Sequence, residues 1–185
     1  MTVYAELHAL SNFTFLRGAS HPEELVETAV ELNYDALAIT DECTVSGIVR
    51  AHVAAKKTTL KKLIIGSEFR LDTGLKLVVL ARNRSGYKEL CSLITCGRRA
   101  TKKGSYKLTA NDFSHGLPNC FVLWIPDSHL LFSSEDTWII DVFSKRLWIA
   151  VELHSDGYEK MRVEKLRNLS AKLKLPLVAS GDVHM

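Results

Sequence analysis

Ala36-Leu37-Ala38-Ile39-Thr40-Asp41-Glu42 is a short apolar run that ends in a hydroxyl group and two carboxylates. Such a run is too short for a helix and fits a buried strand. Three further stretches end in the same way: Ala5-Glu6-Leu7-His8-Ala9-Leu10-Ser11, Lys62-Leu63-Ile64-Ile65-Gly66-Ser67-Glu68 and Gly181-Asp182-Val183-His184-Met185. In a β/α barrel the carboxyl ends of the strands meet on one face, where the chemistry gathers. The four polar strand ends therefore predict one shared pocket.

Strands and helices are expected to alternate almost from end to end of the chain. The pattern predicts strands at residues 3–8, 36–40, 63–71, 75–81, 120–125, 147–153 and 177–180, and helices at 22–32, 46–57, 84–99, 135–145 and 158–173. Nearly continuous apolar strands between helices are typical of a parallel sheet covered on both faces. We therefore expect an α/β fold of about seven strands, one of which could be a hairpin partner, closed as a barrel. The alternative is an open doubly wound sheet, which the lack of a GxGxxG or GxxxxGK loop disfavours.

The composition sets limits on location and partners. The 185 residues suffice for one domain with a full core, and 46% hydrophobic with 24% charged residues is ordinary for a globular protein. A net charge of +3 is too small to indicate a nucleic-acid surface by itself. No run approaches the ~20 apolar residues of a membrane span, so no membrane partner is expected. The cysteines form no CxxC pair, which fits free thiols in a reducing cytosol and a cytoplasmic location.

The chain ends directly after the last polar strand end, at Asp182 and His184. A barrel that finished there would lack a helix over its final strand and would expose a sheet edge. We therefore expect residues 1–185 to be a fragment of a longer protein, truncated at its C-terminal end.

The strand ends carry residues that suit a metal centre. Neutral imidazole and carboxylate groups bind zinc, manganese and iron, and clustered metals can hold a phosphate and activate water. The full set of candidate ligands is His8, Asp41, Glu42, Glu68, Asp182 and His184. The alternative is that each of these groups is satisfied by a neighbouring loop, and the residues alone leave both interpretations open.

Longer phrases connect these strand ends to a known family. The quoted strand ends, together with Ser11-Asn12-Phe13-Thr14-Phe15-Leu16-Arg17-Gly18-Ala19-Ser20-His21-Pro22-Glu23-Glu24-Leu25, closely match it. The sequence resembles the N-terminal PHP (polymerase and histidinol phosphatase) domain of bacterial C-family DNA polymerases of the polymerase III α-subunit type, in the error-prone branch. The resemblance covers all 185 residues and is weakest from about residue 101 to 141. It implies a distorted seven-stranded β/α barrel, in which hydrolytic members hold up to three metal ions.

The resemblance implies that several metal ligands are missing. Leu10 stands where the second His of His-x-His belongs, Arg17 where an acid belongs, Glu42 where a His belongs, and Lys76 where another His belongs. The Cys ligand of the family would fall near Pro126 or Asp127. The ligands that are kept are His8, Glu68, Asp182 and His184. One divalent ion (Zn, Mn or Mg), weakly held or absent, is therefore expected, and no catalytic residue is assigned.

Arg17 is the most informative of these changes. An Arg side chain stays charged at every relevant pH, so it would repel a divalent ion at that position. We expect Arg17 to reach into the pocket, pair with Glu42 or Asp41, and act as a fixed substitute for the missing metal charge.

The function implied by the resemblance is that of a PHP domain in an error-prone DNA polymerase for translesion synthesis and DNA repair. The domain itself would be structural or partner-binding, and its partners would be the rest of the polymerase, other translesion or replication proteins and, through the parent enzyme, DNA. One alternative is an active metal-dependent phosphoesterase, either a 3′–5′ exonuclease or a pyrophosphatase. A free-standing phosphatase of small phosphate esters is the third hypothesis.

Overall fold

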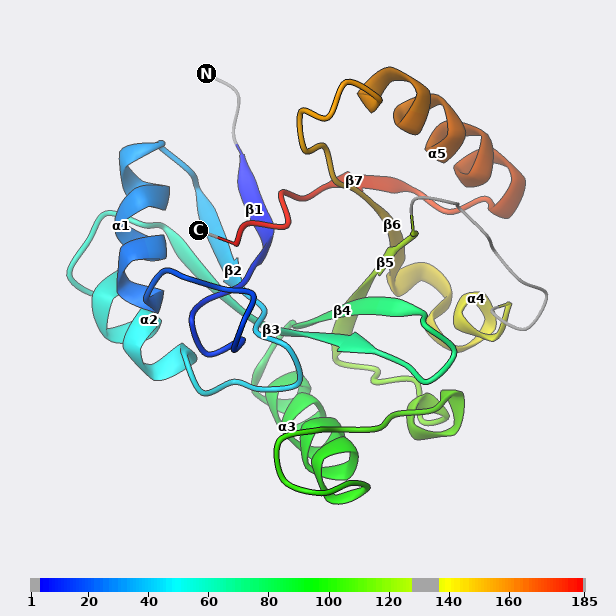
Figure 1. Ribbon diagram of the computed structural model, residues 1–185, viewed down its shortest axis with the longest axis horizontal. Coiled ribbons are helices and arrows are strands. Elements are labelled where there is room, and N and C mark those ends of the chain that lie inside the picture. Colours follow the sequence, from blue (N-terminus) through cyan, green and yellow to red (C-terminus); the bar gives the residue numbers. More distant parts are fainter. Residues whose placement is uncertain (1–3, 128–136, 185) are drawn as a thin grey trace.

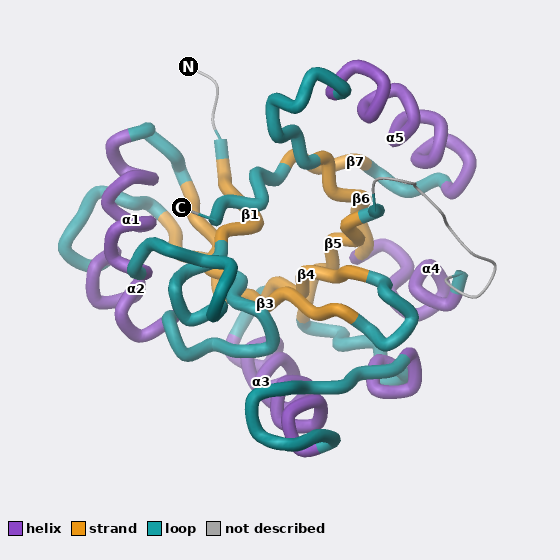
Figure 2. The backbone as a smooth tube through the Cα atoms, viewed as in Figure 1, coloured by secondary structure: helices purple, strands orange, loops and turns teal. Residues whose placement is uncertain are grey.

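The strands close into a barrel with the helices outside it. The computed structural model describes residues 4–127 and 137–184. Within them, seven strands follow one another around the barrel in chain order. Figure 2 shows the strands as an inner ring and the helices around it. The strands are β1 (Ala5–Ala9), β2 (Ala36–Ile39), β3 (Lys62–Arg70), β4 (Lys76–Ala81), β5 (Cys120–Ile125), β6 (Leu147–Val151) and β7 (Leu177–Ala179).

The helices lie close to their predicted positions. In Figure 1, α1 and α2 lie together beside β1 and β2, while α3, α4 and α5 follow around the outside. Their bounds are α1 (Pro22–Glu31), α2 (Ile48–Ala55), α3 (Arg84–Arg99), α4 (Trp138–Phe143) and α5 (Glu159–Leu173), with the 3-10 helices η1 (Ala110–Phe113) and η3 (Ser144–Arg146). The helix expected at residues 135–145 is thus shorter, and residues 135 and 136 lie outside the described part. None of the described helices is both long and apolar enough to cross a membrane.

The sheet is not parallel throughout: β4 is the hairpin partner that the sequence analysis allowed for, and the expected parallel pairing holds for the other neighbouring strands. β4 runs antiparallel to both β3 and β5, whereas the other neighbouring strands pair in parallel. β3 and β4 form a hairpin because only residues 71–75 separate them, too few for a crossover. The first residue of β4, Lys76, therefore lies at the same end of the barrel as the carboxyl ends of the parallel strands.

Apolar side chains cover both faces of the barrel wall. In β4, Val78 and Leu80 belong to the cluster inside the barrel, while Leu77 and Val79 pack in the cluster outside. All four are nearly or fully buried. This alternation explains why the strands read as continuous apolar runs, since a strand buried on both faces needs apolar residues at every position.

The end of the chain returns to its beginning. After β7, Val183 forms a parallel bridge with Ala9. The backbone N–H of Val183 donates to the carbonyl of His8 at 3.0 Å, and that of Leu10 donates to Val183 at 2.8 Å. The barrel is therefore nearly closed, and the free edge expected next to the last strand is bridged at this point.

Candidate functional site

Four strand ends, those of β1, β2, β3 and β7, meet at one rim of the barrel, as the sequence predicted. His8 lies in β1, Glu68 lies in β3, and Asp182 with His184 follows β7. The side chains of His8 and Glu68 are fully buried. Asp182 has a left-handed backbone (φ 50°), a conformation that Asp tolerates better than most residues. These four expected ligands lie in one pocket, connected by the contacts described below.

Glu68 is the centre of the pocket and is surrounded by positive charge. Arg17 donates from Nη1 to Oε1 at 2.6 Å and from Nη2 to Oε2 at 3.1 Å. The ammonium of Lys76 lies 3.1 Å from Oε2, and Nε2 of His8 lies 2.9 Å from the same oxygen. Burial alone would raise the pKa of Glu68, but hydrogen bonds from His8 and Arg17 and the charge of Lys76 hold it well below its usual range. Glu68 is therefore a carboxylate with three cationic partners.

His8 is held as an imidazolium. Its Nδ1 lies 2.8 Å from Oε1 of Glu152, and its Nε2 lies 2.9 Å from Glu68. A neutral imidazole has only one N–H, so two ionised carboxylates on opposite nitrogens favour the protonated ring. Burial would lower the pKa of His8, but hydrogen bonds to Glu152 and Glu68 outweigh it and raise the pKa to about 9. In this state His8 has no lone pair for a metal.

Arg17 reaches into the pocket, which confirms the prediction made for it. Its Nη1 donates to Oε2 of Glu42 at 2.7 Å, in addition to its bonds to Glu68. The hydroxyl of Tyr106 donates to the other oxygen of Glu42 at 2.8 Å. The side chains of Arg17 and Glu42 are 28% and 26% exposed, so this pair lies at the mouth of the pocket rather than at its base.

Asp41 is the exception among the expected rim residues. It makes no described contact with Arg17 and accepts hydrogen bonds from the backbone N–H and hydroxyl of Ser11 and from the hydroxyl of Thr14. Burial raises the pKa of Asp41 even though these hydrogen bonds oppose it. Asp41 therefore fastens the loop after β1, which carries Arg17. Asp41 thus fits the alternative stated in the sequence analysis, in which a polar group at a strand end is satisfied by a neighbouring loop.

Asp182 connects the pocket to the end of the chain. Its Oδ1 lies 2.8 Å from Nε2 of His184, 3.3 Å from Nδ1 of His8 and 3.6 Å from Nζ of Lys76. Burial would raise the pKa of Asp182, but the nearby charges of His8 and Lys76 lower it. His184 is 40% exposed and marks the outer limit of the network.

A divalent ion in the pocket would have to fit among the contacts of His8, Glu68 and Asp182. His8, Glu68 and Asp182 each offer one ligand atom, all within 4.8 Å of one another, a spacing that could hold a divalent ion. However, Lys76 already contacts both carboxylates. The ring of His8 also donates protons rather than lone pairs. An ion does not fit this arrangement unless Lys76 withdraws and His8 loses a proton.

Two members of the network have roles that the sequence analysis missed. Glu152, 8% exposed, binds His8 and accepts a hydrogen bond from the hydroxyl of Ser180 at 3.2 Å. Glu152 directly follows the apolar run of β6, as Asp41 follows that of β2, so the same pattern could have identified it. It was missed because the strand was expected to extend to residue 153. Lys76 was regarded as a lost ligand rather than as a partner of Glu68, because the direction of β4 was not known.

Comparison with known proteins agrees with this architecture. The PHP domain profile matches residues 6–118. The chain belongs to the PHP domain family. It is 53% identical over 187 residues to an error-prone DNA polymerase of Dechloromonas aromatica, covering 98% of this chain and 18% of that protein. It is 49% identical over 185 residues to an error-prone DNA polymerase of Pseudomonas aeruginosa, covering 100% of this chain and again 18% of that protein. This PHP chain thus spans about a fifth of the length of these relatives.

Solved structures show the same fold at low sequence identity. A protein described as a metal-dependent phosphoesterase from Bifidobacterium adolescentis has a TM-score of 0.74 and 16% identity, covering 100% of this chain and 89% of that one. An amidohydrolase from Chromobacterium violaceum has a TM-score of 0.67 and 15% identity, covering 97% and 87%. These likenesses confirm the barrel fold predicted from the sequence.

Proposed function

We propose that this chain is the PHP domain, over residues 1–185, of a longer error-prone DNA polymerase that acts in translesion synthesis and DNA repair. The support is the high identity to proteins named error-prone DNA polymerase along nearly the whole chain. The test is primer extension by the full-length protein on templates with and without an abasic site. Extension past the lesion supports the proposal, and failure on both templates contradicts it.

We further propose that the pocket is a structural ion-pair network and not a hydrolytic centre. The observation that carries this proposal is the carboxylate of Glu68, which is fully buried and bound by Arg17, Lys76 and His8. A buried charge is tolerated only when it is paired and hydrogen-bonded. In hydrolytic sites a metal ion supplies the positive charge and activates water. Here Arg17, Lys76 and His8 supply the charge, and a side-chain cation does not activate water as a metal ion does.

His8, Glu68, Asp182 and His184 remain the proposed ligands of one weakly held divalent ion (Zn, Mn or Mg). Weak binding is expected because the ion would have to compete with the ammonium of Lys76 for oxygens of Glu68 and Asp182. It would also have to release the proton that His8 shares with its carboxylate partners.

Hydrolysis assays test the structural role. The chain is incubated with Mn²⁺ or Zn²⁺ and, separately, with DNA carrying a free 3′ end, pyrophosphate and a small phosphate monoester. We expect rates no higher than those of the His8→Ala variant, which removes a central pocket residue. Metal-dependent hydrolysis that His8→Ala abolishes would overturn the proposal.

One observation favours the second candidate function, a metal-dependent phosphoesterase. It is the grouping of ligand atoms from His8, Glu68 and Asp182 within 4.8 Å. The same assays decide between the two functions, because only the phosphoesterase predicts turnover that depends on both the metal and His8.

The proposed partners are the remainder of the polymerase, other translesion or replication proteins and, through the parent enzyme, DNA. The proposed location is the cytoplasm. Cross-linking of the full-length protein in cells treated with a DNA-damaging agent tests these partners. Recovery of replication or lesion-bypass proteins would support the proposal. If cross-links form efficiently within the polymerase but none of these proteins is recovered, the proposal is contradicted.

A further inference from the structure

A second group of potential metal ligands lies beside the ion-pair network. Glu152, His154 and Asp182 each offer one ligand atom, and these atoms all lie within 4.8 Å of one another. Glu152 and His154 follow β6, and Asp182 follows β7. We propose that these three side chains bind one divalent transition-metal ion, with zinc or manganese as the chemical class. The proposal concerns metal binding alone and does not depend on the polymerase assignment.

The free donor atoms of this group are the first support. Among the described residues, the ring of His154 has no hydrogen-bond or ion-pair partner, so it keeps a lone pair when neutral. Glu152 uses only Oε1, for His8 and Ser180. Its Oε2 has no hydrogen-bond partner within the described part of the chain. An imidazole and two carboxylates form a donor set that suits zinc and manganese.

The distribution of charge is the second support. Glu68 contacts three cations, Arg17, Lys76 and His8, whereas His8 is the one cation that contacts Glu152 within the described part of the chain. Lys76 lies 3.1 Å from Glu68 but 3.6 Å from Asp182. An ion at Glu152 and His154 therefore avoids the contact with Arg17 that an ion at Glu68 would meet, although His8 contacts both Glu152 and Asp182 and Lys76 contacts Asp182. It displaces no described partner of His154 or of Oε2 of Glu152.

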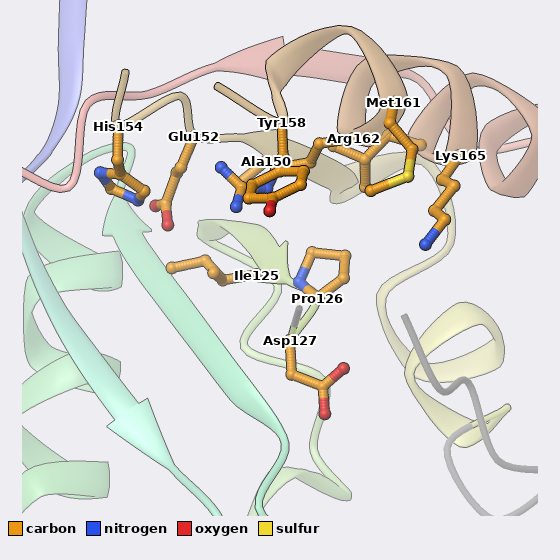
Figure 3. Close-up of a pocket in the computed structure, with 11 residues that line it drawn as sticks. Ile125, Pro126, Asp127, Ala150, Glu152, His154, Tyr158, Met161, Arg162 and Lys165 are labelled. Atoms are coloured by element: carbon orange, nitrogen blue, oxygen red, sulfur yellow. The ribbon is translucent and has the colours of Figure 1, made fainter. Parts of the chain in front are cut away.

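The third support is access. A cavity of about 430 Å³ opens next to Glu152 and His154, which follow β6, and side chains of α5 also line it. Figure 3 shows the ring of His154 and the carboxylate of Glu152 next to each other at one side of this cavity. The space admits an ion with water in its remaining coordination positions, as sites with three protein ligands commonly have.

Two cations of α5 line the same cavity and limit the affinity. Arg162 is paired with Asp156 through Nη2 at 2.6 Å, and Lys165 lies further along the helix. Because Asp156 offsets part of the charge of Arg162, we expect their repulsion to weaken ion binding without preventing it.

The test is calorimetric titration of the chain with ZnCl₂ and, separately, with MnCl₂. Three variants are compared with the parent: His154→Ala, Glu68→Gln and, as a matched control, His115→Ala, which removes another exposed His. Circular dichroism establishes that each variant is folded. We expect one ion that binds this second group more tightly than any ion binds His8, Glu68 and Asp182, an affinity at least tenfold lower for His154→Ala, and no change for His115→Ala.

Three outcomes would overturn the proposal. The first is the absence of binding by the parent chain. The second is unchanged affinity in His154→Ala together with lost binding in Glu68→Gln, which would place the ion at His8, Glu68 and Asp182. The third is an equal loss in His154→Ala and His115→Ala, which would indicate adventitious binding by surface imidazoles. Anomalous scattering from zinc-soaked crystals gives an independent readout, with a peak expected between Glu152 and His154.

Discussion

The guanidinium of Arg17 makes two hydrogen bonds to the carboxylate of Glu68, at 2.6 and 3.1 Å, 51 residues apart in the chain. This paired geometry is among the strongest that two ionised side chains can adopt. It places a permanent cation on a fully buried acid that lies at the centre of the rim. The pocket is therefore charge-compensated by its own side chains.

Removing Arg17 should destabilise the domain much more than removing a surface arginine. Loss of one partner from a buried ion pair costs about 3–5 kcal/mol, and because Arg17 is 28% exposed we expect about 2–3 kcal/mol for Arg17→Ala. Urea unfolding measures this loss. Arg50→Ala is the control, because Arg50 pairs with Glu23 on the surface and such pairs contribute about 0–1 kcal/mol. Equal losses in the two variants would disprove the role of Arg17.

A double-mutant cycle should locate the main partner of Arg17. We expect a coupling free energy of about 1–3 kcal/mol between Arg17→Ala and Glu68→Gln. A smaller coupling is expected with Glu42→Gln, because Glu42 is 26% exposed and also binds Tyr106. Part of the loss in Arg17→Ala should still be recovered by adding Glu42→Gln. The order of the two couplings decides this prediction, and the reverse order would refute it.

Gly18 should be intolerant of a side chain. A Cβ at Gly18 would lie 2.0 Å from the carbonyl oxygen of Ser11, too close without movement of the backbone. Because Gly18 follows Arg17 directly, we expect Gly18→Ala to displace the arginine and to destabilise the domain by about 2 kcal/mol or more. Ala19→Ser, at the exposed neighbouring position, is the control and should change the melting temperature little. A melting temperature for Gly18→Ala equal to that of the control would contradict the packing.

The stability of the domain should fall at alkaline pH because of His8. Its pKa is raised from 6.5 to about 9, so its contribution is complete below pH 6.5 and is lost as the pH rises through about 9. Since one pKa unit corresponds to about 1.4 kcal/mol, the loss is on the order of 3 kcal/mol. Urea unfolding without divalent ions, at intervals from pH 6 to pH 10, measures it.

The control for this pH dependence is His8→Gln. The variant should be less stable at pH 6 and should lose less stability than the parent between pH 6.5 and pH 9, because Gln does not titrate. Parallel curves for the two proteins would show that another group causes the fall.

Lys76 should compete with metal ions. Its ammonium lies against Glu68 and Asp182, so Lys76→Ala removes the competing charge and should raise the affinity for Mn²⁺ by about tenfold, equivalent to about 1.4 kcal/mol. The gain in Mn²⁺ affinity should persist when His154→Ala is added. The reason is that Lys76→Ala frees oxygens of Glu68, which belongs to the ligand group of His8, Glu68 and Asp182 and not to that of His154. Calorimetric titration tests both statements. An affinity unchanged by Lys76→Ala would show that the lysine does not compete with the metal ion.

The pattern of residues was sufficient to predict much of the fold. Continuous apolar runs such as Cys120–Ile125 were assigned as strands with the bounds that β5 has, because a strand buried on both faces is apolar at every position. The helix at Arg84–Arg99 was also assigned with its observed bounds, since its apolar residues recur at helical spacing. Local patterns of this kind do not depend on the rest of the molecule.

The residues of the rim could be predicted because they stand at or near the ends of the apolar runs that form the strands, but their partners could not. The sequence by itself predicted that His8, Glu68 and Asp182 share one end of a barrel, and its resemblance to the family implied that Arg17 replaces an acid. Only the tertiary structure decided that β4 runs antiparallel, which brings Lys76 to that rim, and that Glu152 binds His8 across 144 residues of chain. The physical reason is that strand direction and side-chain contacts between distant segments arise from packing around the whole barrel, whereas the pattern of residues reports only the burial of each element.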